Sequence, residues 1–206
     1  MITILDGGMG GEIQKRLAGA AKGLWSATAL VDSPELVVAL HREYIEAGAR
    51  MIITNTYSTV PSYLAKGNLE AEFERYTALG GELARKAVTQ SGESVQVAGS
   101  LPPLSESYRP DLAPEAAIAK PIYARLARAL EPYVDLFLCE TMSSADEAYH
   151  AASQAKAEGN GKPVYVAWTL NETPGTGLRS GESLLTAFER LADLDIDGYL
   201  LNCTTP

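Results

Sequence analysis

Short apolar runs rich in β-branched residues alternate along the chain with longer amphipathic segments. The runs cover residues 2–5, 50–55, 94–99, 134–140, 163–170 and 198–203. Because each run is nearly continuous in apolar character, we expect strands that are covered on both faces, as in a parallel sheet. The segments between them carry apolar residues at helical spacing. These predicted helices cover residues 34–47, 68–90, 114–133, 145–157 and 182–194.

The predicted elements follow the order strand then helix, five times over, with a sixth strand at the end. Strand starts that lie roughly 30 to 50 residues apart leave room for one helical crossover each. The pattern predicts an α/β fold in a single domain over residues 1–206, either an open doubly wound sheet or a closed barrel. The glycines after the first run (GGMGG, residues 7–11) do not fit the G-x-G-x-x-G dinucleotide fingerprint and are compatible with a tight turn.

Residues that favour helix starts precede several of the predicted helices. Ser33 is a candidate N-cap, and Pro34 suits the first helical position because its missing N–H is not needed there. Ser144 and Ser180 are the corresponding candidates for the last two helices.

Composition and charge narrow the class of protein. The 206 residues are 46% hydrophobic and 21% charged, as in an ordinary soluble domain. A net charge of -9 argues against nucleic acid or an anionic membrane as the main partner. We find no run long enough for a membrane helix and no signal peptide, so we expect a cytoplasmic protein. The two cysteines, Cys139 and Cys203, do not make a disulfide framework, and we expect both to be reduced.

Polar or reactive side chains follow nearly every predicted strand. The carboxyl ends of parallel strands meet at one side of a sheet or barrel, so these side chains predict a ligand site there. They are Asp6, Gly7 and Gly8, then Thr54, Asn55, Thr56 and Tyr57, then Gly99 and Ser100, then Cys139, Glu140 and Thr141, and finally Asn202, Cys203 and Thr204.

Three of these residues have reactive side chains, and each could have either a functional or a structural role. Asp6 and Glu140 could bind a ligand ammonium group or act as general acid or base, or they could cap a loop or helix. A carboxylate at the end of the run LFLC would cost several kcal/mol if buried unpaired, which favours a functional Glu140. Cys203 could ligate a metal or simply be a small buried residue. Cys139 alternates with Glu140 on a strand, so we expect it to face the helices as a structural residue.

Other catalytic arrangements find little support. His41 and His150 fall in predicted helices, and neither an H-x-x-x-H nor a G-x-S-x-G motif is present. Arg179 and Ser180 in GLRSGES could bind an anion or cap the next helix. A metal-free lyase or aldolase would need a lysine at a strand end. The following lysines fall in predicted helices or loops instead: Lys66, Lys86, Lys120, Lys156 and Lys162.

The segments together resemble the homocysteine S-methyltransferase family along the whole chain. The matching segments are ILDGGMGGEI, LWSATALVDSPELVVALHREYIEAGARMIITNTY, AGSLPP, DLFLCETM, LRSGES and LLNCTTP. The resemblance implies a closed (β/α)8 TIM-type barrel and transfer of a methyl group to the sulfur of homocysteine, giving methionine. It also implies one zinc ion held by three cysteine thiolates, of which Cys203 matches the first.

The resemblance also assigns roles to the strand-end residues. Asp6 with the backbone of Gly7 and Gly8 would line the homocysteine pocket, and Glu140 would bind its ammonium group. Zinc held by three thiolates would leave one position open for the substrate sulfur, whose thiol it would deprotonate. Residues Thr54, Asn55 and Tyr57 would line the mouth of the site.

The sequence ends at Pro206 without the adjacent cysteine pair that supplies the other two ligands in this family. We therefore expect a barrel present only through about its sixth strand, with one of three zinc ligands and impaired activity. The alternative is a non-catalytic binding or scaffold protein that keeps the amino-acid pocket without the metal. As the methyl donor we expect a small molecule such as S-methylmethionine or S-adenosylmethionine.

Overall fold

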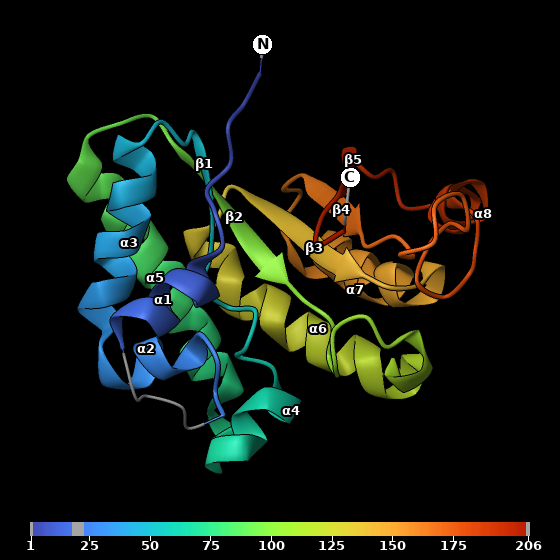
Figure 1. Ribbon diagram of the computed structural model, residues 1–206, viewed down its shortest axis with the longest axis horizontal. Coiled ribbons are helices and arrows are strands. Elements are labelled where there is room, and N and C mark those ends of the chain that lie inside the picture. The colour runs from blue at the N-terminus through green and yellow to red at the C-terminus, as the bar shows by residue number, and fades with distance from the viewer. Residues whose placement is uncertain (1, 18–22, 205–206) are drawn as a thin grey trace. The chain divides into compact units, whose positions relative to one another are not determined.

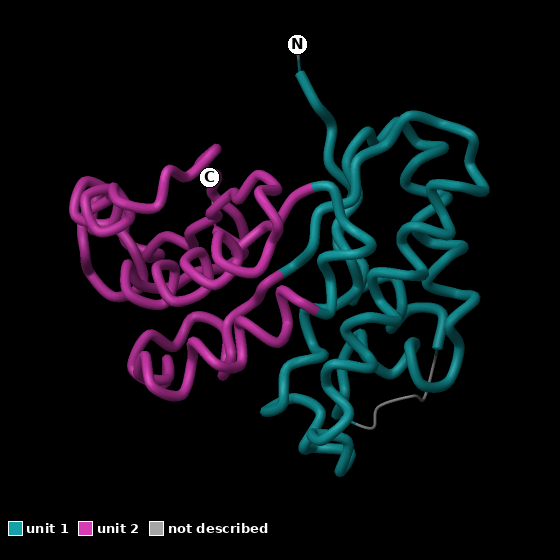
Figure 2. The backbone as a smooth tube through the Cα atoms, turned by 180° about the vertical axis from the view of Figure 1, so that it is seen from behind, with its two compact units in different colours: residues 1–100, 129–135 teal, residues 101–128, 136–206 magenta. Residues whose placement is uncertain are grey.

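The computed structural model describes residues 2–17 and 23–204, which fall into two compact units (Figure 2). Unit 1 comprises residues 1–100 and 129–135, and unit 2 comprises residues 101–128 and 136–206. The helices and strands are labelled in Figure 1. No helix within the described part of the chain is long and apolar enough to cross a membrane.

Unit 1 is built around two parallel strands that helices cover. Strand β1 (Met51–Ile53) pairs with β2 (Gln96–Leu101), and Ile52 lies opposite Val97, both fully buried. Helices α3 and α5 pack against each other, and both bury an apolar face, as the helical periodicity predicts (Figure 1). The helices of this unit are α1 (Met9–Arg16), α2 (Ala27–Asp32), α3 (Pro34–Glu46), α4 (Pro61–Leu64) and α5 (Phe73–Ser91), with short 3-10 turns at Ala65–Gly67, Glu70–Glu72 and Glu131–Tyr133.

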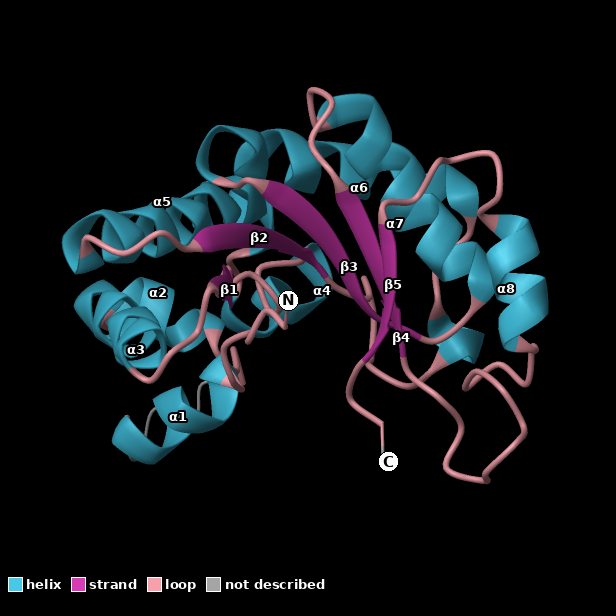
Figure 3. Cartoon of the chain, turned by 90° about the horizontal axis from the view of Figure 1, so that it is seen from above, coloured by secondary structure: helices cyan, strands magenta, loops and turns pink. Residues whose placement is uncertain are grey.

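Unit 2 repeats the same arrangement with three parallel strands. Strand β4 (Val164–Trp168) lies between β3 (Leu136–Met142) and β5 (Gly198–Leu201), and α7 (Ala145–Glu158) packs against β3 and β4 (Figure 3). The buried ring of Trp168 stacks on Tyr199 and meets the edge of Phe188, which ties β5 and α8 (Leu184–Arg190) to the core. Helix α6 (Ala116–Leu130) and a 3-10 turn at Pro110–Leu112 complete the unit.

The strand predicted at residues 2–5 is wrong. Only Leu5 forms a β-bridge, to Met51, and the side chains of Ile2 and Ile4 are 92% and 59% exposed. The segment runs beside β1, but only Leu5 is partly covered, so it does not develop into a strand with a buried face. The other five predicted strands form, and their ends lie no more than two residues from the expected ones.

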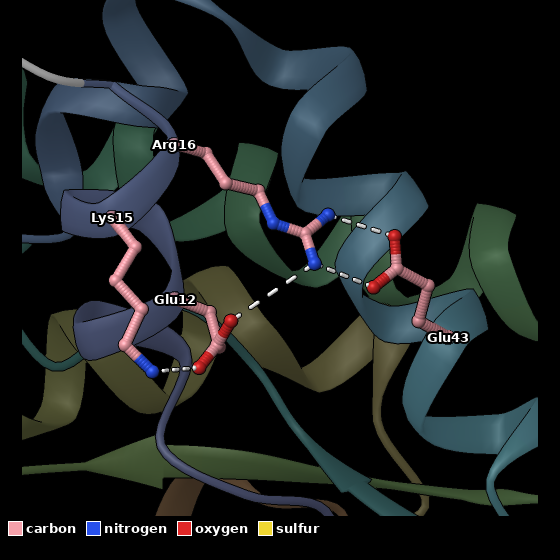
Figure 4. Close-up of polar contacts among 4 residues, drawn as sticks. All are labelled: Glu12, Lys15, Arg16 and Glu43. Atoms are coloured by element: carbon pink, nitrogen blue, oxygen red, sulfur yellow. Dashed lines mark hydrogen bonds and ion pairs between the residues drawn. The ribbon is translucent and has the colours of Figure 1, made fainter.

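Helix α1 was not predicted, because four glycines suggest a turn. Gly8 is instead its N-cap residue, and Gly10 lies inside it, where a Cβ would collide with the ring nitrogen of Trp25. Figure 4 shows how α1 is joined to α3, since the Arg16 guanidinium donates two hydrogen bonds of 2.7 Å to the Glu43 carboxylate. Both side chains are exposed, so this pair fixes geometry more than it adds stability.

The predicted helix caps are partly right. Ser144 caps α7, since its hydroxyl accepts a hydrogen bond of 3.2 Å from the Glu147 N–H. Ser33 precedes α3 as predicted, but its side chain makes no capping hydrogen bond. The prediction for Ser180 is wrong: α8 begins later, and Ser183 caps it by accepting from Thr186 N–H at 3.1 Å.

Gly80 in α5 tests how tightly unit 1 is packed. A Cβ there would lie 2.6 Å from the methyl group of Thr56, whose side chain is fully buried and held by hydrogen bonds to Thr54 and Ser100. We expect Gly80→Ala to lower the free energy of unfolding by about 2 kcal/mol, because overpacking outweighs the better helix propensity of alanine.

The matched control is Gly11→Ala in α1, where nothing lies within 4 Å of the added Cβ. This change should raise stability by up to about 1 kcal/mol through helix propensity alone. Urea unfolding of both variants measures the difference, and a Gly80→Ala protein as stable as the wild type would contradict the tight packing.

Candidate functional site

Asp6 is held firmly at the start of unit 1. Its N–H donates to the carbonyl of Met51 at 3.0 Å, and its Oδ2 accepts from the N–H of Ile53 at 2.9 Å. The side chain is only 2% exposed, and Nδ1 of His41 in α3 lies 4.0 Å from Oδ2. Burial of His41 lowers its pKa to about 4, so the ring is neutral near pH 7. Asp6 is therefore a carboxylate fixed in place beside a neutral imidazole.

The other predicted site residues of unit 1 differ in how much their side chains can reach. Thr54 and Asn55 are each 3% exposed. The hydroxyl of Thr54 accepts from Ser100 N–H at 3.0 Å, and the amide of Asn55 donates to the carbonyl of Ser26 at 3.1 Å. The side chains of Thr54 and Asn55 thus form hydrogen bonds inside the unit. Gly7 and Gly8 are exposed, and Tyr57 is partly exposed.

In unit 2, strand β3 contains a bulge just where its polar residues begin. From the Cys139–Val166 pair to the Met142–Trp168 pair, β3 advances three residues while β4 advances two. Thr141 takes up the extra residue, with a positive φ of 59° that a β-branched side chain rarely adopts. The bulge releases the Thr141 N–H from the ladder.

Asn202, directly after β5, accepts a hydrogen bond from that N–H. Its Oδ1 accepts from Thr141 N–H at 2.9 Å, and its Nδ2 donates to Thr141 Oγ1 at 3.1 Å and to Glu140 Oε2 at 3.4 Å. Its backbone N–H donates to the carbonyl of Trp168 at 3.1 Å. The amide therefore joins the ends of β3 and β5 and contacts the predicted Glu140 carboxylate directly.

Cys203 continues the same network at the surface. Its thiol is exposed, and its Sγ accepts a hydrogen bond from Thr141 Oγ1 at 3.6 Å. Its carbonyl accepts from Thr169 Oγ1 at 3.0 Å, and its φ is 50°. The other cysteine, Cys139, is fully buried with a free thiol, and burial raises its pKa far above the usual range. The prediction that Cys139 is structural is confirmed.

Arg179 lies close to this network but is occupied by protein groups. Its Nη1 pairs with Glu172 at 3.0 Å, and its guanidinium lies 4.8 Å from the ring centroid of Tyr108. The backbone N–H of Arg179 donates to the Thr169 carbonyl at 3.4 Å. Beside it is an open depression of about 650 Å³ formed by the loop after β4. The depression is lined by residues 170–177, Gly181, Ser183, Leu184 and Thr204.

The described residues do not fit a zinc ion held by three thiolates. Within residues 2–17 and 23–204, no three His, Cys, Asp or Glu side chains are grouped so that they could hold a metal. Cys203 presents one accessible thiol, and Cys139 is buried away from solvent.

The structure thus groups the predicted residues by unit. Glu140 and Cys203 belong to unit 2 and are linked through Thr141 and Asn202. The remaining predicted residues, Asp6, Gly7, Gly8, Thr54, Asn55 and Tyr57, belong to unit 1. Sequence reasoning placed Thr141 and Asn202 at strand ends but gave them no role, and it passed over His41 because it lies on a helix.

Parallel strands that alternate with helices and end in polar side chains define an α/β protein of the class that binds ligands at its strand ends. The sequence model of the homocysteine S-methyltransferase family matches residues 3–206. A homocysteine S-methyltransferase of Escherichia coli K12 is 31% identical over 99% of this chain and 71% of the relative. Homocysteine S-methyltransferase 1 of Brassica oleracea var. italica is 28% identical over 99% and 69%. The chain therefore belongs to the homocysteine S-methyltransferase family.

Solved structures support the same assignment. The metallated form of the homocysteine methyltransferase MmuM from Escherichia coli superposes with a TM-score of 0.85 at 29% identity, over 98% of this chain and 74% of that one. Its apo form gives 0.76 at 27% identity, over 99% and 73%. The predicted α/β barrel fold class is confirmed by these neighbours.

Proposed function

We propose that the protein binds homocysteine and transfers a methyl group to its sulfur from a small sulfonium donor, giving methionine. The observation that carries this proposal is the network that links the Glu140 carboxylate to the Cys203 thiol through Asn202 and Thr141. A carboxylate at one end and a thiol at the other suit an amino acid with an ammonium group and a sulfur atom.

Each group has a distinct proposed task. Glu140 binds the substrate ammonium as a charge-assisted partner. The role of Asp6, Gly7 and Gly8 in substrate binding stays a prediction. The substrate thiol loses its proton to solvent, and the thiolate sulfur then forms a bond to the donor methyl. The bond from that methyl to the donor sulfur breaks, and its electron pair stays on the donor as a neutral thioether. S-methylmethionine and S-adenosylmethionine both fit this description.

Among the described residues, Cys203 is the proposed zinc ligand. Because those residues do not form a three-thiolate site, no step of the reaction is assigned to the metal. The same observation favours a second candidate function, a protein that binds the amino acid without metal or turnover. Assay of methionine formation from homocysteine and S-methylmethionine, together with zinc analysis of wild type and Cys203→Ser, separates the two functions. A cytoplasmic location also stays a prediction.

Glu140→Gln tests the proposed binding mode. We expect isothermal titration calorimetry to show stoichiometric homocysteine binding to the wild type and binding at least about tenfold weaker to Glu140→Gln, because a charge-assisted hydrogen bond is lost. Glu189→Gln, an exposed carboxylate on α8, is the control and should bind as the wild type does. Equal affinity in wild type and Glu140→Gln, or no binding by the wild type, would refute the proposal.

A further inference from the structure

We infer that Asn202 is a positioning residue, which orients the Glu140 carboxylate toward the ammonium group of the substrate. The inference rests on the proposed function of Glu140 and extends it to the residue that holds it. It draws on the hydrogen bonds that Asn202 makes at the ends of β3 and β5.

The orientation of the Asn202 amide follows from its partners. A backbone N–H can only donate, so the atom 2.9 Å from Thr141 N must be the amide oxygen. The amide nitrogen then faces Thr141 Oγ1 at 3.1 Å and Glu140 Oε2 at 3.4 Å. Asn202 therefore presents a donor to the carboxylate, and rotation of the amide by 180° would break its bond from Thr141 N–H.

The bulge at Thr141 makes this contact possible. In a regular strand the Thr141 N–H would be used in the ladder, but the extra residue in β3 turns it toward Asn202. A threonine with φ of 59° is strained, and such strain persists only where surrounding contacts hold it. Here the N–H and the hydroxyl of Thr141 both bond to Asn202, and the hydroxyl also reaches Cys203 Sγ at 3.6 Å.

A donor on one carboxylate oxygen restricts the side chain without neutralising its charge. Oε2 of Glu140 accepts a hydrogen bond from the amide, which is a neutral donor and so leaves the charge of the carboxylate unchanged. Glu140 is partly exposed, so a ligand can reach it. Without Asn202 the side chain would sample other rotamers, and binding would have to restrict them again. The loss should therefore appear for ligands with an ammonium group and not for ligands that lack one.

The test compares two ligands on the intact chain. Homocysteine carries the ammonium group, and 4-mercaptobutyrate is the same molecule without it. We expect Asn202→Ala to weaken homocysteine binding about tenfold in calorimetry while 4-mercaptobutyrate binding changes less than about twofold. Asn160→Ala, in the turn that follows α7 at the opposite end of the parallel strands, is the matched control and should change neither.

Two results would overturn the inference. Equal weakening of both ligands would mean that Asn202 supports the unit or the sulfur end, and no weakening would mean that Glu140 does not need it. A ligand-free measurement separates this inference from the proposed function: the side-chain amide NMR signals of Asn202 should shift in Glu140→Gln. Failure of homocysteine to bind the wild type refutes the function, whereas an unshifted amide signal refutes the contact itself.

Discussion

Lowering the pH from 6.5 to 4 should remove about 3 kcal/mol from the stability of unit 1 through His41 alone. The ring is fully buried in α3, and burial lowers its pKa from 6.5 to about 4. Between these values the unfolded chain binds a proton that the folded chain does not. Stability contributed by the neutral ring is therefore complete above pH 6.5 and is lost as the pH falls toward 4.

His41→Phe removes this titration while keeping a planar ring. The slope of unfolding free energy against pH should become flatter in the variant between pH 4 and 6.5, whatever its absolute stability. The two tryptophans, Trp25 in unit 1 and Trp168 in unit 2, allow urea unfolding of each unit to be followed by 19F NMR of 5-fluorotryptophan. His150→Phe, at a partly buried position, is the control and should flatten the slope much less. An unchanged slope in His41→Phe would contradict the assignment.

Raising the pH should destabilise unit 2, through Glu147. Its side chain is buried in the first turn of α7, and burial raises its pKa from 4.5 to about 7, against the favourable hydrogen bond from Ser143 N–H. Here the folded chain holds a proton that the unfolded chain loses. The stability that Glu147 contributes to unit 2 is therefore greatest below pH 4.5 and falls by about 3 kcal/mol as the pH rises through 7.

Glu147→Gln keeps the shape of the side chain and cannot ionise. Its amide oxygen can still accept a hydrogen bond from Ser143 N–H. We expect the variant to be more stable than the wild type above pH 7 and nearly equal to it below pH 4.5, as read from Trp168. Asp146→Asn, an exposed neighbour on the same turn, should show no such divergence.

The parts of the fold that the sequence predicted are those decided by local pattern. Strands β1 to β4, which bury apolar side chains, and helices such as α3 and α7 follow from apolar periodicity and, for the two helices, from Pro34 and Ser144 at their starts. Strand β5 forms as well, although its apolar side chains are exposed. Helix α1 was missed because the need for glycine at position 10 comes from a residue distant in sequence. A side chain at Gly10 would collide with the ring of Trp25. The start of α8 was misplaced because Ser180 and Ser183 are equally good caps locally, and tertiary contacts choose between them.

The candidate site was predicted less completely, for a related reason. Position at a strand end identified Glu140 and Cys203, and their roles stay proposals. The contact between Asn202 and Thr141 depends on a bulge. The bulge arises from pairing between strands and cannot be predicted from the residues of β3 alone. Glu147 could have been noticed, since Ser144 and Glu147 form the S-x-x-E pattern of a capping box. Its burial could not, because nothing in α7 itself distinguishes it from the exposed Asp146.

The left-handed conformations of Thr141 and Cys203 bear on how this protein could be engineered. Glycine adopts positive φ freely, so substitution by glycine is the usual way to relieve such strain and gain thermal stability. At these two positions the relief would remove the hydroxyl that contacts Asn202 and the thiol beside it. Thermostability and the proposed function are therefore opposed at the ends of β3 and β5, and a stabilised variant is better sought elsewhere, for example at the open helical position of Gly11.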